Sequence, residues 1–387
     1  MFRRLLIPLT SNSFFLFGAR GTGKSTLVHA LLQNQPVLEI DLLSQSEFEQ
    51  ALLAPAELEA RIEAAVNEKK WIFIDEVQKA PRILDTVQRF IDRSHAKFVL
   101  TGSSARKLKR GGANLLAGRA YQYHLYPLLS TELQSHFDLD TYLAFGGLPQ
   151  IWNITENAER VLYLRSYVST YLKQEIAEEQ IVRNLEPFGR FLQVAAQSSG
   201  KIINYAKIAR DVGASDQTVK TYFQILEDTL LGFFLPVFHE SVRKSQGKAP
   251  KFYLFDLGIL RALQRRIDQP LTDQNFAYGD LFEHFIIYEI RRRAEYAGKD
   301  FEFFFLRTDR GDEIDLIIVR PGLPRAVIEI KSSQSIRHDD VEPILRLGKD
   351  IKDAELWCLS RDPQPKQFST LRAVHWTEGV ERIVQGK

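Results

Sequence analysis

Residues 18–26 read GARGTGKST and directly follow the apolar run Phe14–Phe17. The apolar run predicts a short buried strand, and residues 26–32, TLVHALL, predict a helix. Between the two, the segment from Gly18 to Ser25 meets the pattern G-x-x-x-x-G-K-[ST]. Strand, glycine-rich loop and helix in this order are typical of a phosphate-binding loop, and the alternative is a glycine-rich turn in an unrelated α/β protein.

Each residue type in this loop has a physical reason. Glycines allow backbone N–H groups to surround a phosphate without side-chain collisions, and the helix N-terminus adds a partial positive charge there. We expect Lys24 to reach the β- and γ-phosphates and the Ser25 hydroxyl to be a ligand of Mg²⁺. The predicted nucleotide-binding residues are Gly18, Ala19, Arg20, Gly21, Thr22, Gly23, Lys24, Ser25 and Thr26.

Acidic residues follow a second apolar run. Residues 71–74, WIFI, predict a buried strand that ends in Asp75 and Glu76. The carboxyl end of a parallel strand is where an α/β sheet places its ligands. We therefore expect Asp75 to bind Mg²⁺ and Glu76 to be the general base for the attacking water. The alternative is a strand that ends in a polar turn.

A third apolar run, residues 97–100, is followed by TGSS at 101–104, and we expect Ser103 to touch the γ-phosphate or orient the water. This position resembles the sensor of AAA+ ATPases. Arg119, in the segment LLAGR, is the candidate finger toward the nucleotide of a neighbouring subunit, a role that requires a homo-oligomer. Arg106 and Arg110 are alternatives to it, and each of the three could equally be an ordinary surface arginine.

The order of these motifs, followed by YPLLSTE at 126–132 and FGGLP at 145–149, resembles one family over essentially the whole chain. The family is that of the bacterial and archaeal AAA+-like ATPases that carry a C-terminal domain of unknown function, DUF4143. The resemblance implies ATP rather than GTP as the nucleotide. It implies no settled activity for the C-terminal domain.

The middle of the chain changes to a helical period. Residues 126–185 predict a helical lid that changes position with nucleotide state. In residues 186–262, Asn204 and Ser215 predict the caps of two successive helices, as in a winged helix-turn-helix. Such a module often serves a structural role or contacts protein instead of DNA.

A basic turn supports contact of this module with DNA. The run RKSQGK at 243–248 separates the predicted wing strands Phe233–His239 and Lys251–Phe255. The four basic residues Arg243, Lys244, Lys248 and Lys251 suit contacts with phosphates, although a basic turn is also commonly just solvated. Because no base-reading arginine is evident on the second helix, we expect DNA binding without sequence specificity.

A second constellation lies in residues 263–387. A helical run from Gly279, strands at 301–306, 313–319 and 326–331, a helix from Asp339 and a strand at 355–359 give the order of a restriction-endonuclease-like core. Its candidate site matches the PD-(D/E)XK pattern. The residues are Asp315, Glu329 and Lys331, with Glu283 as an additional carboxylate and Gln334 as a residue that could line the same site.

The spacing of these residues suits metal-dependent phosphodiester cleavage. Glu329 and Lys331 are two apart on one strand and so share a face. Carboxylates of Glu283, Asp315 and Glu329 would gather Mg²⁺, and Lys331 would position the attacking water. Two alternatives stay open: alternating charges on an exposed strand, and a nuclease fold that binds nucleic acid or protein without cutting.

Composition sets broad limits. The 387 residues carry 51 basic and 49 acidic side chains, a near balance that allows only a local nucleic-acid surface. One cysteine and eight scattered histidines give neither an intrachain disulfide nor zinc-ligand spacing. Apolar runs fall short of the roughly 20 residues of a membrane helix, so we expect a cytoplasmic protein.

Together these features predict an α/β multidomain chain. Its parts are an AAA+-like P-loop core with a parallel sheet (1–125), the lid (126–185), the winged helix (186–262) and a nuclease-like α/β domain (263–387). The leading hypothesis is a Mg²⁺-dependent ATPase that couples nucleotide state to its C-terminal domain. That domain would bind nucleic acid and is a candidate for DNA cleavage. The alternatives are an ATP-regulated switch or scaffold whose inactive nuclease-like domain docks a protein partner, and a nucleotide-binding protein with negligible turnover.

Overall fold

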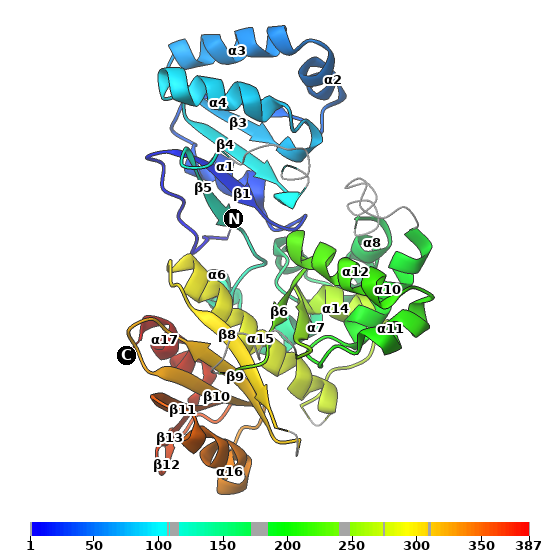
Figure 1. Cartoon of the computed structure of the whole chain (residues 1–387), viewed down its shortest axis with the longest axis vertical. Coiled ribbons are helices and arrows are strands. Elements are labelled where there is room, and N and C mark those ends of the chain that lie inside the picture. The colour runs from blue at the N-terminus through cyan, green and yellow to red at the C-terminus, as the bar shows by residue number, and fades with distance from the viewer. Residues whose placement is uncertain are drawn as a thin grey trace.

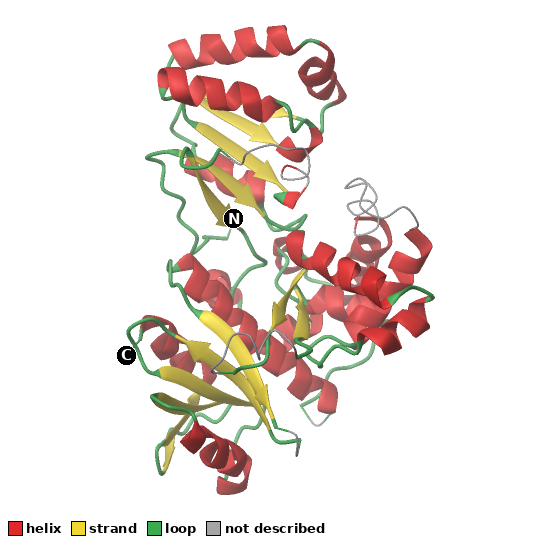
Figure 2. Cartoon of the chain, viewed as in Figure 1, coloured by secondary structure: helices red, strands yellow, loops and turns green. Residues whose placement is uncertain are grey.

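The computed structural model describes residues 2–106, 108, 116–171, 185–239, 248–273, 275–308 and 311–386. Figure 1 shows a parallel sheet with its helices at one end, a helical region at the side, and a second sheet that holds the C-terminus. Figure 2 shows that the two large sheets are separate and are joined by helices and loops. None of the helices in this described part combines the length and the apolar character that a membrane crossing requires.

The first sheet is parallel throughout and has the strand order β2-β3-β4-β1-β5. Its central strands β3, β4 and β1 are fully buried because helices cover both faces. Helix α1 packs on the face of Phe14 and Phe73, and α3 and α4 pack on the face of Phe15 and Ile74. The elements are β1 (Ser13–Phe17), α1 (Lys24–Leu31), β2 (Val37–Asp41), α2 (Gln45–Leu53), α3 (Pro55–Asn67), β3 (Trp71–Asp75), η1 (Val77–Lys79), α4 (Ile83–Ser94), β4 (Phe98–Gly102) and β5 (Ala120–His124).

Short helices follow the sheet, as the helical period predicts. Asp138 caps α7 by accepting a hydrogen bond from Thr141 N, and α7 packs against the later helix α14 (Leu257–Leu263). These short helices therefore pack against a later part of the chain as well as against the parallel-sheet core. Its elements are α6 (Ser130–Leu133), η2 (Gln134–His136), α7 (Leu139–Phe145), η3 (Pro149–Asn153), α8 (Asn157–Ser166) and η4 (Tyr167–Tyr171).

The next module has three helices and two antiparallel strands. Asn204 and Ser215 cap α11 and α12 as expected, because their side chains accept hydrogen bonds from Lys207 N and Thr218 N. We call the strand pair β6–β7 the wing. The described elements are α10 (Leu185–Gln197), α11 (Tyr205–Val212), α12 (Asp216–Asp228), β6 (Gly232–Leu235) and β7 (Lys251–Leu254).

The predicted first wing strand, Phe233–His239, is divided between two partners. Residues 232–235 pair with β7, whereas Val237 bridges to Phe305 of β8. Phe238 N donates to Phe305 O at 2.6 Å, and Phe305 N donates to Pro236 O at 3.0 Å. Directly after β6, the chain thus covers the free edge of the second sheet at β8. The basic run at 243–247 lies outside the described residues, and Lys248 is exposed.

The second sheet has the order β12-β13-β11-β10-β9-β8. Strands β8, β9 and β10 form an antiparallel meander, and β11 joins β10 in parallel, in the order that the sequence predicts. The predicted helix from Asp339 begins one residue earlier. The elements are α15 (Phe276–Tyr296), β8 (Glu302–Arg307), β9 (Glu313–Val319), β10 (Arg325–Lys331), α16 (His338–Leu347), η5 (Gly348–Asp350), β11 (Ala354–Ser360), β12 (Lys366–Phe368), β13 (Leu371–His375) and α17 (Trp376–Gln385).

Helix α15 connects the parts of the molecule. Its apolar residues belong to one continuous cluster with those of the lid, the wing and the second sheet. At its carboxyl-terminal end Tyr296 OH accepts a hydrogen bond from Tyr126 N at 2.9 Å, just beyond β5. Earlier in the helix, Glu289 accepts hydrogen bonds from the Ser130 backbone and hydroxyl. The helix therefore reaches the ATPase core, the lid and the wing.

Candidate functional site

The glycine-rich loop joins β1 to α1 at the carboxyl edge of the parallel sheet. Gly21 and Gly23 have φ of 79° and 91°, in the left-handed region that favours glycine. A Cβ at Gly18 would lie 2.4 Å from Leu125 O, so any larger residue would collide with backbone. The loop geometry therefore requires these glycines.

Lys24 and Ser25 begin α1 and point to different partners. The buried Lys24 ammonium donates to Gly18 O at 2.9 Å and lies 4.0 Å from Glu76 Oε1. Ser25 Oγ donates to Asp75 Oδ2 at 2.7 Å. The structure thus brings together Lys24, Ser25, Asp75 and Glu76, which the sequence places in two separate motifs.

Strand β4 supplies a residue that the sequence analysis missed. Thr101 Oγ1, at the end of β4, donates to Asp75 Oδ1 and accepts a hydrogen bond from Glu76 N at 3.3 Å. Glu76 itself has φ of 57°, a conformation that costs energy for a non-glycine residue and fixes the direction of its side chain. Because Thr101 belongs to the TGSS segment, its hydroxyl was available as a signal.

Ser103, the predicted sensor, contacts this group through Gln78. Gln78 Nε2 donates to Ser103 Oγ at 3.2 Å and also to Glu76 Oε2. Gln78, which lies two residues after Glu76, is a second residue that the sequence analysis missed. The Ser103 hydroxyl is buried at the sheet edge, next to the proposed base.

A cavity of about 520 Å³ lies beside the loop. Arg4 borders it and donates to Thr22 O at 2.7 Å while pairing with Glu132 at 3.0 Å. The volume is in the usual range for small-molecule sites. The lining, most of which carried no local sequence signal, comprises Phe2, Arg4, Gly21, Thr22, Gly23, Thr26, Leu27, Leu128, Pro149, Gln150, Asn153 and Tyr163.

The two candidate finger arginines that the structure describes, Arg119 and Arg106, have different partners. Arg119 precedes β5 and therefore lies at the edge of the sheet opposite the loop, where its Nε donates to Asp92 Oδ1 at 2.5 Å. This hydrogen bond lowers the pKa of the Asp92 carboxyl. The only finger role that this position leaves to Arg119 is one toward another copy of the chain. Arg110 lies outside the described residues.

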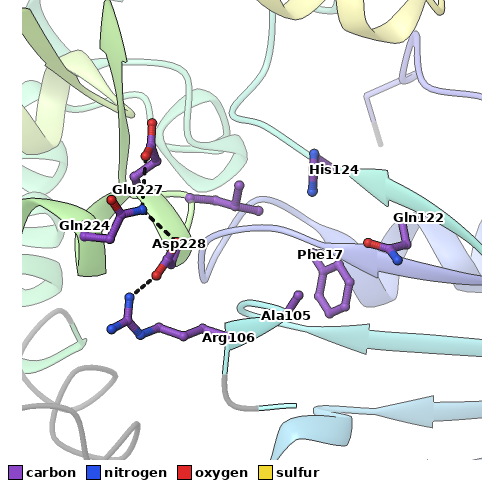
Figure 3. Close-up of a pocket in the computed structure, with 9 residues that line it drawn as sticks. Phe17, Ala105, Arg106, Gln122, His124, Gln224, Glu227 and Asp228 are labelled. Atoms are coloured by element: carbon purple, nitrogen blue, oxygen red, sulfur yellow. Dashed lines mark hydrogen bonds and ion pairs between the residues drawn. The ribbon is translucent and has the colours of Figure 1, made fainter. Parts of the chain in front are cut away.

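Arg106 joins the ATPase core to α12. Figure 3 shows its side chain paired with Asp228. Both residues line a cavity of about 580 Å³. Gln224 of the same helix donates to Glu227 and Asp228. The carboxyl-terminal end of α12 is therefore acidic and faces the core, whereas Gln217 and Lys220 in the first half of the helix are exposed.

The second constellation lies where α15, β9 and β10 meet the wing. Lys331 Nζ pairs with Glu329 Oε1 at 2.6 Å, and Asp315 Oδ2 accepts a hydrogen bond from Ile330 N at 2.7 Å. The structure therefore places Asp315, Glu329 and Lys331 beside one another, as the sequence predicts. Gln334 is exposed, in the segment after β10.

Residues that the sequence analysis missed complete this cluster. Lys251, the first residue of β7, places its Nζ 2.5 Å from Glu313 Oε1 and 3.2 Å from Glu283 Oε1. Tyr253 OH donates to Glu283 Oε1 at 2.7 Å. Glu313 precedes Asp315 by two positions on the same strand face, which was a usable signal. The sequence places Lys251 among the basic residues of the wing that would contact phosphates, and this expectation is wrong, because tertiary packing buries its side chain in the carboxylate cluster.

Burial dominates the ionisation of this cluster. It raises the pKa of Asp315 well above the ordinary value, and the Glu329 and Glu283 carboxylates raise it further while Lys251 lowers it. Burial also raises the pKa of Glu329, against the opposite effect of Lys331. Burial would lower the pKa of Lys251, but the surrounding carboxylates outweigh this and the pKa is raised.

The predicted metal ligands Glu283, Asp315 and Glu329 are not arranged around a metal position. In the described part of the chain, no group of three or more His, Cys, Asp and Glu side chains has a geometry that could hold a metal ion. The Lys251 ammonium lies against Glu313 and Glu283 of this cluster. The predicted Mg²⁺ site in the C-terminal domain therefore does not fit the residues as they are placed.

Three family models match successive parts of the chain. A model described as an AAA domain matches residues 10–134, the domain of unknown function DUF8612 matches 136–270, and the domain of unknown function DUF4143 matches 278–377.

The related proteins cover most of the chain. An uncharacterized protein of Mycobacterium tuberculosis is 25% identical over 322 residues, which are 83% of this chain and 70% of the relative. An uncharacterized protein of Haemophilus influenzae is 23% identical, with 88% of this chain and 90% of the relative covered. An uncharacterized protein of Methanocaldococcus jannaschii is 20% identical, with 90% and 82% covered.

Among solved structures, a Signal Transduction ATPase with Numerous Domains (STAND) protein from Pyrococcus horikoshii, with a tetratricopeptide repeat sensor, aligns with a TM-score of 0.27 and 12% identity. The alignment covers 74% of this chain and 45% of that protein. The sequence matches define the architecture: the chain carries an AAA domain at residues 10–134 and a DUF4143 domain at residues 278–377, joined by a domain of the DUF8612 type.

Proposed function

We propose that the chain is a Mg²⁺-dependent ATPase whose nucleotide state is coupled, through the lid and the wing module, to the C-terminal domain. The observation that carries the proposal is the joint position of Lys24, Ser25, Asp75 and Glu76 at one edge of the parallel sheet. Phosphates held by the loop would lie against the Lys24 ammonium, which now donates to the carbonyl of Gly18 within the loop itself.

The residues fit a Mg²⁺ ion at this edge. Ser25 Oγ and Asp75 Oδ2 are oxygen atoms 2.7 Å apart, and hydroxyl and carboxylate oxygens suit this ion. When bound, Mg²⁺ would neutralise charge on the phosphates. The hydrogen bond from Thr101 orients the Asp75 carboxylate, and Glu76, held between Gln78 and Lys24, would accept a proton from the attacking water.

Contacts between the loop and the lid support coupling. Tyr167 OH, at the end of the lid, donates to Arg20 O of the loop at 2.8 Å. Pro149, Asn153 and Tyr163 line the cavity from the lid side, so a nucleoside in it would touch both parts. The Arg106–Asp228 ion pair adds a second link, from the core to α12.

Steady-state phosphate release and equilibrium ATP binding, measured on the whole chain, test this function. Wild type is expected to hydrolyse ATP with Mg²⁺, Lys24→Ala to lose binding, and Glu76→Gln to bind ATP without turnover. Binding by wild type with no phosphate release would leave a nucleotide-binding switch. Unchanged binding by Lys24→Ala would contradict the assigned phosphate site.

A second candidate function is action on nucleic acid by the C-terminal domain, supported by the proximity of Asp315, Glu329 and Lys331. Plasmid and single-stranded DNA, incubated with Mg²⁺ or Mn²⁺ and with or without ATP, give the test. Cleavage that disappears in Asp315→Ala, Glu329→Ala would establish a nuclease. Intact DNA in all conditions, with salt-insensitive or absent binding, would favour a scaffold that docks a protein partner.

A further inference from the structure

A buried ammonium from the wing occupies the carboxylate cluster of the C-terminal domain. The Lys251 side chain is only 4% exposed, and its Nζ contacts Glu313 at 2.5 Å and Glu283 at 3.2 Å. The same Nζ lies 5.2 Å from the centre of the Phe305 ring of β8. The cation therefore comes from a residue outside the second sheet and points into it.

The charges around it need such a cation. Four carboxylates, those of Glu283, Glu313, Asp315 and Glu329, lie within electrostatic reach of one another, and Lys331 pairs with only one of them at 2.6 Å. Buried carboxylates without a counter-charge are strongly unfavourable. A divalent metal ion is one way to neutralise such a group, and Lys251 is the neutralising charge found here.

The backbone holds Lys251 in this place. It pairs with Leu235 of β6 on one side and bridges to Ile202 on the other. Two residues later, Tyr253 donates to Glu283 and packs its ring against His284 of α15, with ring centres 4.9 Å apart. The backbone pairing and the contacts of Tyr253 thus fix the position from which the Lys251 side chain reaches the carboxylates.

We propose that Lys251 is the resident cation of this cluster and that it keeps divalent metal ions out of the site formed by Glu283, Glu313, Asp315 and Glu329. The site takes no divalent metal as long as the wing is docked on α15. This goes beyond the proposed ATPase function and does not depend on it. It bears directly on the second candidate function, since a PD-(D/E)XK nuclease without its metal does not cut.

Binding of Mn²⁺ to the full-length, nucleotide-free protein tests the proposal, followed by electron paramagnetic resonance. The variant is Lys251→Met, which keeps the unbranched stem and removes the charge, and the matched control is Lys248→Met, an exposed lysine three residues earlier. Lys251→Met is expected to gain a Mn²⁺ site that wild type and Lys248→Met lack. Its affinity for Mn²⁺ should be roughly tenfold or more above that of wild type, which is the effect expected from removing one close charge. The gain should vanish in Lys251→Met, Asp315→Asn, Glu329→Gln. Because all these proteins share an unchanged P-loop, weak Mn²⁺ binding there cancels in the comparison.

A folding readout guards against loss of structure. Mn²⁺ should raise the melting temperature of Lys251→Met more than that of wild type, because only the variant has unneutralised carboxylates in the cluster to bind it. A folded Lys251→Met with no new Mn²⁺ site overturns the proposal. If Lys251→Met does not fold, the test uses wild type and the double variant Asp315→Asn, Glu329→Gln. Mn²⁺ binding by wild type that the double variant loses overturns the proposal. Mn²⁺ binding that is the same in both proteins supports the proposal.

Discussion

The Ser25 hydroxyl donates a 2.7 Å hydrogen bond to Asp75 Oδ2 across a separation of 50 residues. The other oxygen of the same carboxylate accepts a hydrogen bond from Thr101 at the end of the next strand. Three segments that are adjacent only in the folded sheet thus fix one carboxylate. Its orientation is therefore sensitive to each of them.

Replacement of Thr101 by valine should slow hydrolysis more than it weakens ATP binding. The change keeps the shape but removes the hydroxyl that orients Asp75 and accepts a hydrogen bond from Glu76 N. Loss of such a supporting contact typically costs about 10–100-fold in activity. Phosphate release and ATP affinity measured side by side check this. Ser103→Ala is the control, with a smaller expected effect, and a Thr101→Val protein at full rate would contradict the assignment.

Tyr163→Ala should weaken ATP binding by roughly tenfold, the scale expected for loss of an aromatic contact. Tyr163 lines the cavity beside the loop, and its OH lies 3.5 Å from the position of a Cβ on Gly21. Leu162→Ala is the matched control, because Leu162 is the preceding residue of α8 and is 66% exposed. Titration with a fluorescent ATP analogue measures both. Equal affinities of the two variants would exclude the cavity as the nucleoside site.

The Arg106–Asp228 pair should show measurable coupling. Both side chains are partly shielded, at 11% and 34% exposure, so a double-mutant cycle with Arg106→Ala and Asp228→Asn is expected to give an interaction of about 1 kcal/mol. Unfolding by urea provides the free energies. The coupling should shrink at high salt, because the pair is partly exposed to screening. A coupling of zero at low salt would mean that this pair does not hold α12 to the core.

Acid should weaken the contact between α15 and the ATPase core. Burial alone would raise the pKa of Glu295, but hydrogen bonds from His124 and Tyr126 outweigh it, so the pKa is lowered. A lowered pKa means that the ionised carboxylate stabilises the fold above its unfolded pKa of about 4.3, and that this stability is lost as pH falls through the lower folded value. Glu295→Gln should be less stable than wild type at neutral pH and show a shallower loss of stability below about pH 4. Thermal unfolding as a function of pH measures this, with Glu302→Gln on the exposed end of β8 as the control; identical pH profiles of wild type and Glu295→Gln would disprove it.

Local patterns predicted a large part of this molecule. The caps Asn204 and Ser215 work through contacts three residues away, and the P-loop and DE motifs are confined to short segments, so both are visible in the sequence. The succession of β8, β9, β10 and β11 along the chain was also predicted, whereas β12, β13 and α17 were not. The Lys251–Glu283 contact was not predictable, because it depends on how the wing packs against α15. The same is true of the bridge from Val237 to Phe305, since a strand signal does not name its partner.

Helix α15 buries charged side chains such as Glu289 and Arg292 together with its apolar residues. The region matched as DUF4143 begins at residue 278, two residues inside this helix, although the helix also serves the core, the lid and the wing. The parts of the chain are therefore not interchangeable modules. A C-terminal fragment produced alone would expose apolar side chains of α15 that the other parts cover, and it would tend to aggregate. Over evolutionary time, changes in one part must be matched by changes in the others.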